Sequence, residues 1–221
     1  MYRLRESVSI VPDKAATTSP LVIVVDDDAG IRASLEDLFL TVGLDTACFS
    51  STAEFLAAGL PERQSCLVLD VRLPQESGLD LQDRLVGLGA QLPIVFITGH
   101  ADVPMTVRAM KLGAVNFLPK PFRDQELLEA VWEALRMDAE RRAAESEISE
   151  LQQLAEQLTP REIEVLTWVD RGLLNKQIAH ELGLAEITVK MHRSSAFRKL
   201  KARTVTDMIQ KIRLLDLGNR G

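Results

Sequence analysis

Between residues 20 and 136, short apolar runs alternate with segments of helical periodicity, and this alternation constrains the fold more than any other feature. The runs predicted as strands are 21–25, 44–49, 66–69, 93–97 and 114–118. The segments predicted as helices are 31–42, 51–57, 78–88, 103–112 and the stretch from 123 onward. Because each strand is followed by a helix, the connections suit a parallel sheet covered on both faces. We therefore predict a doubly wound α/β domain with a five-stranded parallel sheet at residues 20–136.

Polar and charged residues stand where four of these strands end, which in a parallel sheet places them at one edge. They are Asp26, Asp27 and Asp28 after the first run, Asp70 after the third, Thr98 after the fourth and Lys120 after the fifth. Carboxylates gathered in this way repel one another unless a hard cation such as Mg²⁺ joins them. A metal, a carboxylate nucleophile, a hydroxyl and a cation together suit the acceptance of a phosphoryl group as an acyl phosphate.

The segment after this domain contains neither Gly nor Pro from residue 123 to residue 159. Its middle part, 136–147, is rich in the strong helix formers Ala, Glu and Arg. Apolar residues then recur at steps of three and four from Ile148 to Leu158. Two interpretations remain open, a continuous linker helix and a solvated charged linker with a short helical end. With either, residues 137–157 separate two domains, and residues 1–19 are predicted to be a flexible leader.

The remaining chain, 158–221, differs in charge from what precedes it. Residues 1–158 hold 14 Lys and Arg against 25 Asp and Glu, whereas residues 159–221 hold 12 against 7. Such asymmetry suggests that the C-terminal end binds nucleic acid. Thr159, Pro160 and Glu162 have the spacing of a capping box at a helix start.

Three further helices are predicted after this first one. Asn175 is predicted to cap a helix that runs to Leu182, a glycine-bearing turn follows, and helices are predicted at 186–200 and 204–217. Two helices joined by so short a turn have the helix-turn-helix pattern, and the whole C-terminal domain is predicted to be an all-α four-helix bundle.

These motifs resemble two known families. Residues 20–136 resemble the receiver domain of two-component response regulators, through Val25-Asp26-Asp27-Asp28, Leu69-Asp70, Ile97-Thr98-Gly99 and Leu118-Pro119-Lys120-Pro121-Phe122. Residues 158–217 resemble the LuxR-type DNA-binding domain, through Leu158-Thr-Pro-Arg-Glu162, Asn175-Lys-Gln-Ile-Ala179 and Thr188-Val-Lys-Met-His192. The combination is similar to response regulators of the FixJ/NarL family.

The resemblance implies roles for the receiver residues. Asp70 would accept a phosphoryl group from the phosphohistidine of a sensor histidine kinase. Mg²⁺, or Mn²⁺ in its place, would be held by Asp27, Asp70 and the backbone carbonyl of Arg72, with Asp26 acting through water. Thr98 and Lys120 would bind the phosphoryl oxygens. Phe117 matches an aromatic switch position that is Tyr in many receivers, so a switch that depends on the Tyr hydroxyl is absent here.

For the DNA-binding domain, the resemblance implies that Lys190, Met191 and Ser194 face base edges in the major groove of double-stranded promoter DNA. The candidates for phosphate contact are Thr188, Asn175, Lys176, Arg198 and Lys199. His192 suits either a phosphate contact or a surface position. RNA polymerase is an expected partner, and phosphorylation is expected to produce a homodimer through the helix from Val103, the last strand and the helix from Arg123.

Two other functions share part of this pattern. A constitutive DNA-binding regulator with a vestigial receiver is an alternative, although the intact acidic residues argue against it. A phosphohydrolase of the haloacid-dehalogenase kind needs a second Asp two residues after the first, where Arg72 stands. We expect a regulator rather than an enzyme, because the phosphoryl group ends on the protein itself. Two cysteines without metal spacing and the lack of a signal-peptide core or membrane span predict a cytoplasmic location.

Overall fold

The computed structural model describes residues 19–100 and 102–215. All but the last residue of the predicted leader lies outside these residues, as do the last two residues of the helix predicted at 204–217. The chain forms two compact units that divide after Arg141, and each is described by itself.

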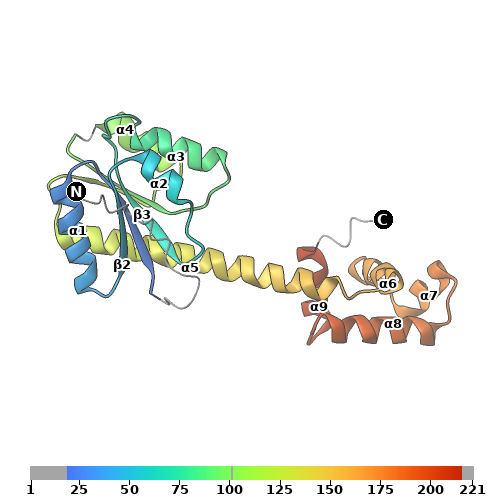
Figure 1. Cartoon of the computed structure of the whole chain (residues 1–221). Coiled ribbons are helices and arrows are strands. Elements are labelled where there is room, and N and C mark those ends of the chain that lie inside the picture. The colour runs from blue at the N-terminus through green and yellow to red at the C-terminus, as the bar shows by residue number, and fades with distance from the viewer. Residues whose placement is uncertain (1–18, 101, 216–221) are drawn as a thin grey trace, which may run out of the picture. The chain divides into compact units, whose positions relative to one another are not determined.

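The first unit is built on a parallel sheet of five strands, which confirms the predicted fold class (Figure 1). The strands are β1 (Leu21–Val25), β2 (Asp45–Phe49), β3 (Ser65–Asp70), β4 (Ile94–Thr98) and β5 (Asn116–Pro119). Their order across the sheet is β2-β1-β3-β4-β5. Because β1 and β3 are neighbours, the residues that follow them lie next to each other at the carboxyl edge.

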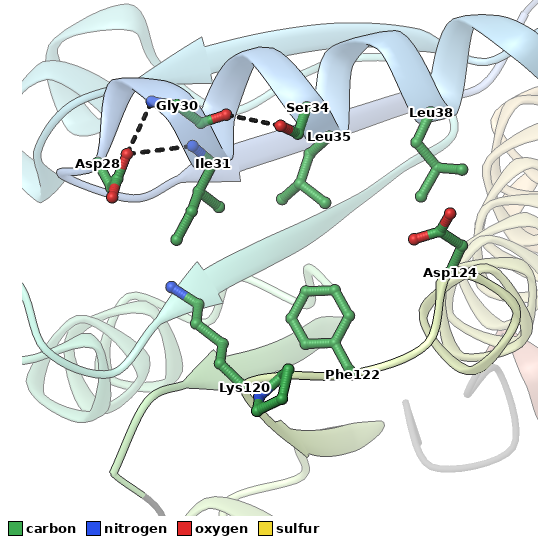
Figure 2. Close-up of a pocket in the computed structure, with 10 residues that line it drawn as sticks. Asp28, Gly30, Ile31, Ser34, Leu35, Leu38, Lys120, Phe122 and Asp124 are labelled. Carbon is green, nitrogen blue, oxygen red and sulfur yellow. Dashed lines mark hydrogen bonds between the residues drawn. The ribbon is translucent and has the colours of Figure 1, made fainter.

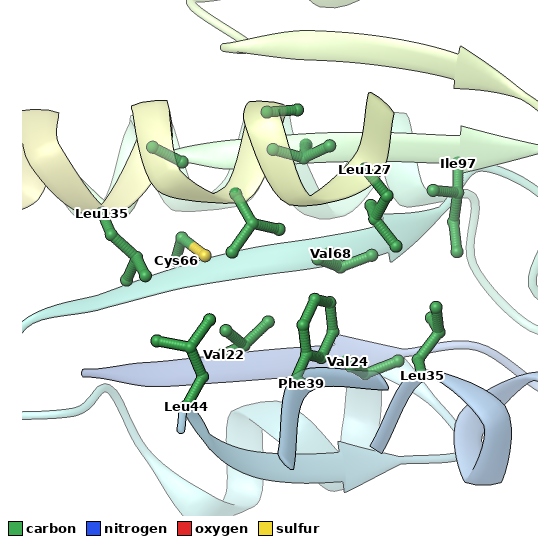
Figure 3. Close-up of a cluster of buried hydrophobic side chains, with 14 residues drawn as sticks. Val22, Val24, Leu35, Phe39, Leu44, Cys66, Val68, Ile97, Leu127 and Leu135 are labelled. Carbon is green, nitrogen blue, oxygen red and sulfur yellow. The ribbon is translucent and has the colours of Figure 1, made fainter. Parts of the chain in front are cut away.

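Helices cover both faces of this sheet. They are α1 (Ala29–Thr41), α2 (Thr52–Ala58), α3 (Gly78–Gly87), α4 (Val103–Lys111) and α5 (Asp124–Ala155). Successive side chains of a strand point to opposite faces, so the core has two halves. On one face Val22, Val24 and Val68 pack against Phe39 of α1 and Leu127 of α5 (Figure 3).

The opposite face is covered by α2, α3 and α4. Ile23, Leu67 and Phe96 of the strands pack there with Phe55 of α2 and Leu81 of α3. Each of these side chains is almost completely buried, and burial of a side chain of this size stabilises a fold by about 1.5–3 kcal/mol. The two halves together fix the sheet, and with it the positions of its carboxyl-end residues.

The long helix α5 resolves the question left open for the linker, since it runs without interruption from Asp124 to Ala155. No Gly or Pro interrupts it, and the continuous linker helix is the interpretation observed. Its residue Asp138 is fully buried and accepts a hydrogen bond from the backbone N–H of Ser65, at the start of β3, at 2.9 Å.

The second unit is helical. Its helices after α5 are α6 (Pro160–Asp170), α7 (Asn175–Leu182), α8 (Glu186–Lys199) and α9 (Val205–Leu214). The predicted capping box is confirmed, because Thr159 and Glu162 exchange backbone-to-side-chain hydrogen bonds of 2.8 and 3.3 Å. Gly183 has φ +62°, a left-handed conformation that ends α7 and allows the short turn into α8.

The predicted cap of α7 is wrong by one residue. Leu174 occupies the cap position, and its backbone N–H donates to the side-chain oxygen of Gln177 at 2.8 Å. Asn175 is the first residue within the helix, and its side-chain oxygen accepts a hydrogen bond from Arg193 of α8 at 2.9 Å. The asparagine therefore joins the two helices of the helix-turn-helix instead of capping one.

Among the described residues, no helix has the length and apolar character that crossing a membrane would need.

Candidate functional site

The carboxyl ends of β1, β3 and β5 bring Asp26, Asp70 and Lys120 together. The Lys120 Nζ lies 2.7 Å from Oδ2 of Asp26 and 2.7 Å from Oδ2 of Asp70. Asp26 is fully buried, Asp70 is nearly so, and the Lys120 side chain is mostly buried. Three residues that are widely separated in sequence thus form one charged cluster, as their positions after the strands predicted.

A metal ion fits the oxygen donors of this cluster. Asp26, Asp27 and Asp70 each offer one carboxylate oxygen, and these atoms lie within 4.8 Å of one another. Asp27 is exposed, so the donor set is open to solvent on one side. Hard oxygen donors with room for water are what Mg²⁺ requires.

Asp28, the third aspartate after β1, has a structural role outside the cluster. Its Oδ1 accepts hydrogen bonds from the backbone N–H groups of Gly30 at 2.7 Å and Ile31 at 3.2 Å, so it caps α1. The run of three aspartates therefore supplies two residues to the cluster and one helix cap. Arg32, in the first turns of the same helix, donates to the carbonyl oxygen of Asp26 at 2.6 Å and holds this loop in place.

The remaining oxygens of Asp26 and Asp70 are bound by nearby backbone. Oδ1 of Asp26 accepts from the N–H of Asp28, and Oδ1 of Asp70 accepts from the N–H of Arg72, both at 2.9 Å. These bonds fix the rotation of both carboxylates. The Arg72 side chain itself is exposed.

Burial opposes the charges in this cluster, whereas hydrogen bonds and opposite charges stabilise them. Burial raises the pKa of the Asp26 carboxyl above its usual range, against the opposing effect of Lys120 and the Asp28 N–H. For Lys120, burial favours the neutral amine, but its hydrogen bonds to Asp26 and Asp70 outweigh burial and raise the pKa of the ammonium. Lys120 therefore carries its positive charge while facing two acidic side chains.

Thr98 is the last residue of β4, and Phe117 lies on the neighbouring strand β5, opposite Phe96. Thr98 is fully buried, and its Oγ1 accepts a hydrogen bond from the N–H of His100 at 3.3 Å. Its carbonyl oxygen accepts from the backbone N–H of Lys120 at 2.7 Å, which ties the two strand ends together. Phe117 is half-buried, with its ring centroid 5.9 Å from that of Phe96.

Gly78 also belongs to the site, although its position in the sequence did not predict this. A Cβ atom at this position would lie 2.3 Å from the backbone oxygen of Asp70, a distance that no side chain permits. The first residue of α3 thus packs directly on the end of β3. A glycine at a predicted helix start gave no signal of this contact, which exists only once the helix has docked on the strand.

A cavity of about 570 Å³ opens next to Lys120, between α1 and the segment that follows β5. Figure 2 shows Lys120 and Phe122 facing the apolar side chains Ile31, Leu35 and Leu38 of α1 across this space. The site therefore has an apolar surface beside its charged groups.

In the second unit, α8 presents one buried and one exposed face. Val189 and Ala196 are fully buried. The exposed residues of α8 include four that are expected to contact DNA, namely Lys190, Met191, Ser194 and Arg198. Lys176 of α7 is exposed as well. Thr188 and His192 are half-buried.

Two of the residues predicted for phosphate contact have partners inside the unit. One is Asn175, which binds Arg193. The other is Lys199, whose Nζ lies 2.7 Å from Oε2 of the buried Glu162 in α6. Lys190 forms a surface ion pair with Glu186, one turn earlier on α8, at 3.2 Å. The sequence pattern could not reveal the partners of Asn175 and Lys199, because these partners come from other helices.

Comparison with known proteins agrees with both halves of this description. The model of the response regulator receiver domain matches residues 22–132, and the model of bacterial regulatory proteins of the luxR family matches residues 156–212. Over 195 residues the chain is 54% identical to nodulation protein W of Bradyrhizobium diazoefficiens, covering 88% of this chain and 86% of that protein. Over 190 residues it is 45% identical to response regulator protein TodT of Pseudomonas putida, covering 86% and 84%.

Among solved structures, the response regulator StyR is similar, with a TM-score of 0.80 and 47% identity, covering 88% of this chain and 98% of StyR. The chain therefore belongs to the response regulators that join a receiver domain to a LuxR-type DNA-binding domain, and it is a phosphorylation-controlled transcriptional regulator.

Proposed function

We propose that Asp70 is the phosphoacceptor, charged by the phosphohistidine of a sensor histidine kinase, and that this event controls binding to promoter DNA. The observation that carries the proposal is the position of Lys120, whose Nζ contacts Asp70 at 2.7 Å. A carboxylate beside a fixed cation can accept a phosphoryl group because the cation offsets the negative charge that arrives with it.

The transfer forms a bond between an Oδ atom of Asp70 and phosphorus, and it breaks the phosphorus–nitrogen bond of the donor imidazole. The product is an acyl phosphate, whose later hydrolysis resets the switch. Lys120 and the Thr98 hydroxyl would bind phosphoryl oxygens. Asp27, Asp70 and the Arg72 carbonyl would hold Mg²⁺, or Mn²⁺, with Asp26 acting through water. When bound, the metal neutralises charge on the transferred group.

Movements of Thr98 and Phe117 would transmit phosphorylation of Asp70 to the rest of the receiver. When Thr98 turns toward the phosphoryl group, it vacates space next to β5 into which the half-buried Phe117 ring can move. Such a change shifts the population between two conformations of the receiver. The face of α4, β5 and α5 would then form a homodimer, and exposed apolar residues support this: Val103 and Met110 on α4 and Trp132 on α5.

The regulated output would be binding of double-stranded promoter DNA by α8, followed by contact with RNA polymerase in the cytoplasm. Lys190, Met191 and Ser194 would face base edges, while Thr188, Lys176 and Arg198 would contact phosphates. Asn175 and Lys199, which have internal partners, would contribute mainly by holding the helices in place. Such a protein is a regulator and not an enzyme, because its phosphoryl group is a signal and not a product.

A direct test compares DNA binding by the full chain before and after treatment with acetyl phosphate and Mg²⁺. The wild-type chain should gain the mass of one phosphoryl group and bind DNA more tightly. Asp70→Asn should lose both responses, whereas Asp37→Asn, a change of the same kind at an exposed position on α1, should keep them. An unchanged phosphate response in Asp70→Asn would rule out Asp70 as the acceptor, and a chain that binds DNA equally with and without phosphate would have a vestigial receiver.

A further inference from the structure

Two large apolar side chains lie side by side on the exposed face of α8. Ile187 is 65% exposed and Met191 is 67% exposed. They are four positions apart in α8, so they lie about one helical turn apart on the same face. We call Ile187 and Met191 the apolar pair. Neither residue belongs to the hydrophobic clusters of this unit, whose contributions from α8 are on the opposite face.

The surroundings of the apolar pair are polar and basic. Lys190 lies between its members in sequence, and Ser194 and Arg198 continue the same face toward the end of the helix. Lys190 is held by Glu186 at 3.2 Å, which directs its ammonium along the helix. Residues 159–221 carry 12 Lys and Arg against 7 Asp and Glu, so this apolar spot is set in a domain suited to a polyanion.

Base edges in the major groove of DNA carry one kind of apolar group, the C5-methyl of thymine, and apolar side chains contact it. Four residues of α-helix rise about 6 Å. That rise is close to two base-pair steps of about 3.4 Å. Two apolar side chains at this spacing can therefore contact methyl groups of nearby base pairs at the same time.

We propose that Ile187 and Met191 recognise thymine methyl groups, so that the bound sequence carries thymines opposite the first half of α8. This inference rests on the proposed function, in which α8 enters the major groove. It adds Ile187 to the residues that determine specificity. It also assigns a chemical role to Met191, which contacts bases through dispersion and methyl packing instead of hydrogen bonds.

The test uses duplexes selected from a random-sequence pool by the phosphorylated full chain. Each thymine of a selected duplex is replaced in turn by deoxyuridine, which lacks only the C5-methyl and pairs in the same way. Removing one contacted methyl should weaken binding about three- to fivefold. At least two thymine positions should respond, and the others should not.

Variants then connect the methyl groups to the residues. Ile187→Ala and Met191→Ala should each bind the thymine duplex more weakly and lose the difference between thymine and uracil at one position. Leu214→Ala removes a side chain that is 57% exposed on α9 in the same unit, and it should keep the full difference. All three side chains are exposed, so the variants should fold, as circular dichroism can verify.

The possible results separate the two proposals. If the phosphorylated chain selects DNA but binds thymine and uracil duplexes equally, the apolar pair does not recognise methyl groups, while the proposed function stands. If no DNA is selected at all, both proposals fail. If the alanine variants instead raise the DNA affinity of the unphosphorylated chain, the apolar pair covers another surface of the protein and the inference is overturned.

Discussion

Gly78 approaches Asp70 so closely that a Cβ atom at position 78 would lie 2.3 Å from the backbone oxygen of Asp70. The N–H of Gly78 also donates to the carbonyl oxygen of Val71 at 2.9 Å. The start of α3 is therefore packed against the backbone that carries the carboxylate of Asp70, the proposed phosphoacceptor. Any side chain at position 78 must displace either the helix or the end of β3.

Gly78→Ala should lower the free energy of unfolding of the receiver by about 1–3 kcal/mol, the usual cost of forcing an extra group into a packed site. It should also reduce phosphoryl uptake from acetyl phosphate, because the Asp70 backbone must shift. Gly87→Ala, at the other end of α3 where a Cβ meets open space, is the matched control and should leave both properties intact or slightly improve stability. Equal behaviour of the two variants in urea unfolding would contradict this account.

Lys120→Met should increase the affinity of the acidic cluster for Mg²⁺ while weakening the response to acetyl phosphate. The ammonium lies 2.7 Å from both Asp26 and Asp70 and repels a divalent cation held by the same carboxylates. Its removal should strengthen metal binding by about 1–2 kcal/mol, seen as a larger rise of Tm with added Mg²⁺. Lys111→Met, on the exposed surface of α4, should bind Mg²⁺ like the wild type. Weaker Mg²⁺ binding by Lys120→Met would contradict the prediction.

The sheet and the acidic cluster were predictable from sequence because both follow from local patterns. An apolar run of five or six residues specifies a buried strand, and in a parallel sheet every such strand delivers its last residue to the same edge. Asp26, Asp70, Thr98 and Lys120 could therefore be grouped from the sequence alone. The glycine-free and proline-free stretch favoured the helix α5 in the same way, although charge alone left a solvated linker open.

What the sequence could not supply are partners that arise from tertiary packing. Lys199 stands in a basic helix and was assigned to phosphate contact, yet its ammonium contacts Glu162 of another helix at 2.7 Å. Asn175 has the residue type of a helix cap but binds Arg193 of α8. These side chains depend on the crossing of helices, which no local pattern encodes.

Asp138 should be needed to hold α5 on the sheet. Its buried carboxylate accepts from the N–H of Ser65 at 2.9 Å and pairs with Arg141 at 2.5 Å. Asp138→Ala should cost about 1–3 kcal/mol in unfolding free energy, since it leaves a buried N–H without its acceptor. Asp138→Asn keeps an acceptor and should cost less. The Ser65 amide should exchange its hydrogen faster in Asp138→Ala.

The control for Asp138 is Glu140→Gln, a change two residues further along α5. It removes the carboxylate from the exposed ion pair between Glu140 and Arg136. An exposed pair of this kind contributes little, so its unfolding free energy should remain close to that of the wild type. If Asp138→Ala and Glu140→Gln unfold alike, the buried carboxylate does not stabilise the attachment of α5 to β3.

The ion pair between Glu162 and Lys199 joins the start of α6 to the end of α8 in the DNA-binding unit. Burial of Glu162 acts to raise the pKa of its carboxyl. Lys199, the N–H of Thr159 and the Ser195 hydroxyl outweigh burial, and together they lower that pKa from 4.5 to about 2. Glu162 is therefore a buried carboxylate that remains charged in the folded state.

Glu162→Gln should destabilise the DNA-binding unit by about 2–3 kcal/mol at neutral pH. Because the folded-state pKa lies below that of the unfolded chain, the stabilisation is fully present above a pH of about 4.5. This stabilisation is lost as the pH falls toward about 2, so the gap in unfolding free energy between wild type and variant should narrow in acid.

Urea unfolding followed by Trp168 fluorescence, with Trp132 replaced by Phe, measures this gap in unfolding free energy. Glu164→Gln, which breaks an exposed pair with Arg161 on the same helix, should show almost none. A gap that stays constant from neutral pH to about pH 3 would mean that the Glu162 charge does not stabilise the fold.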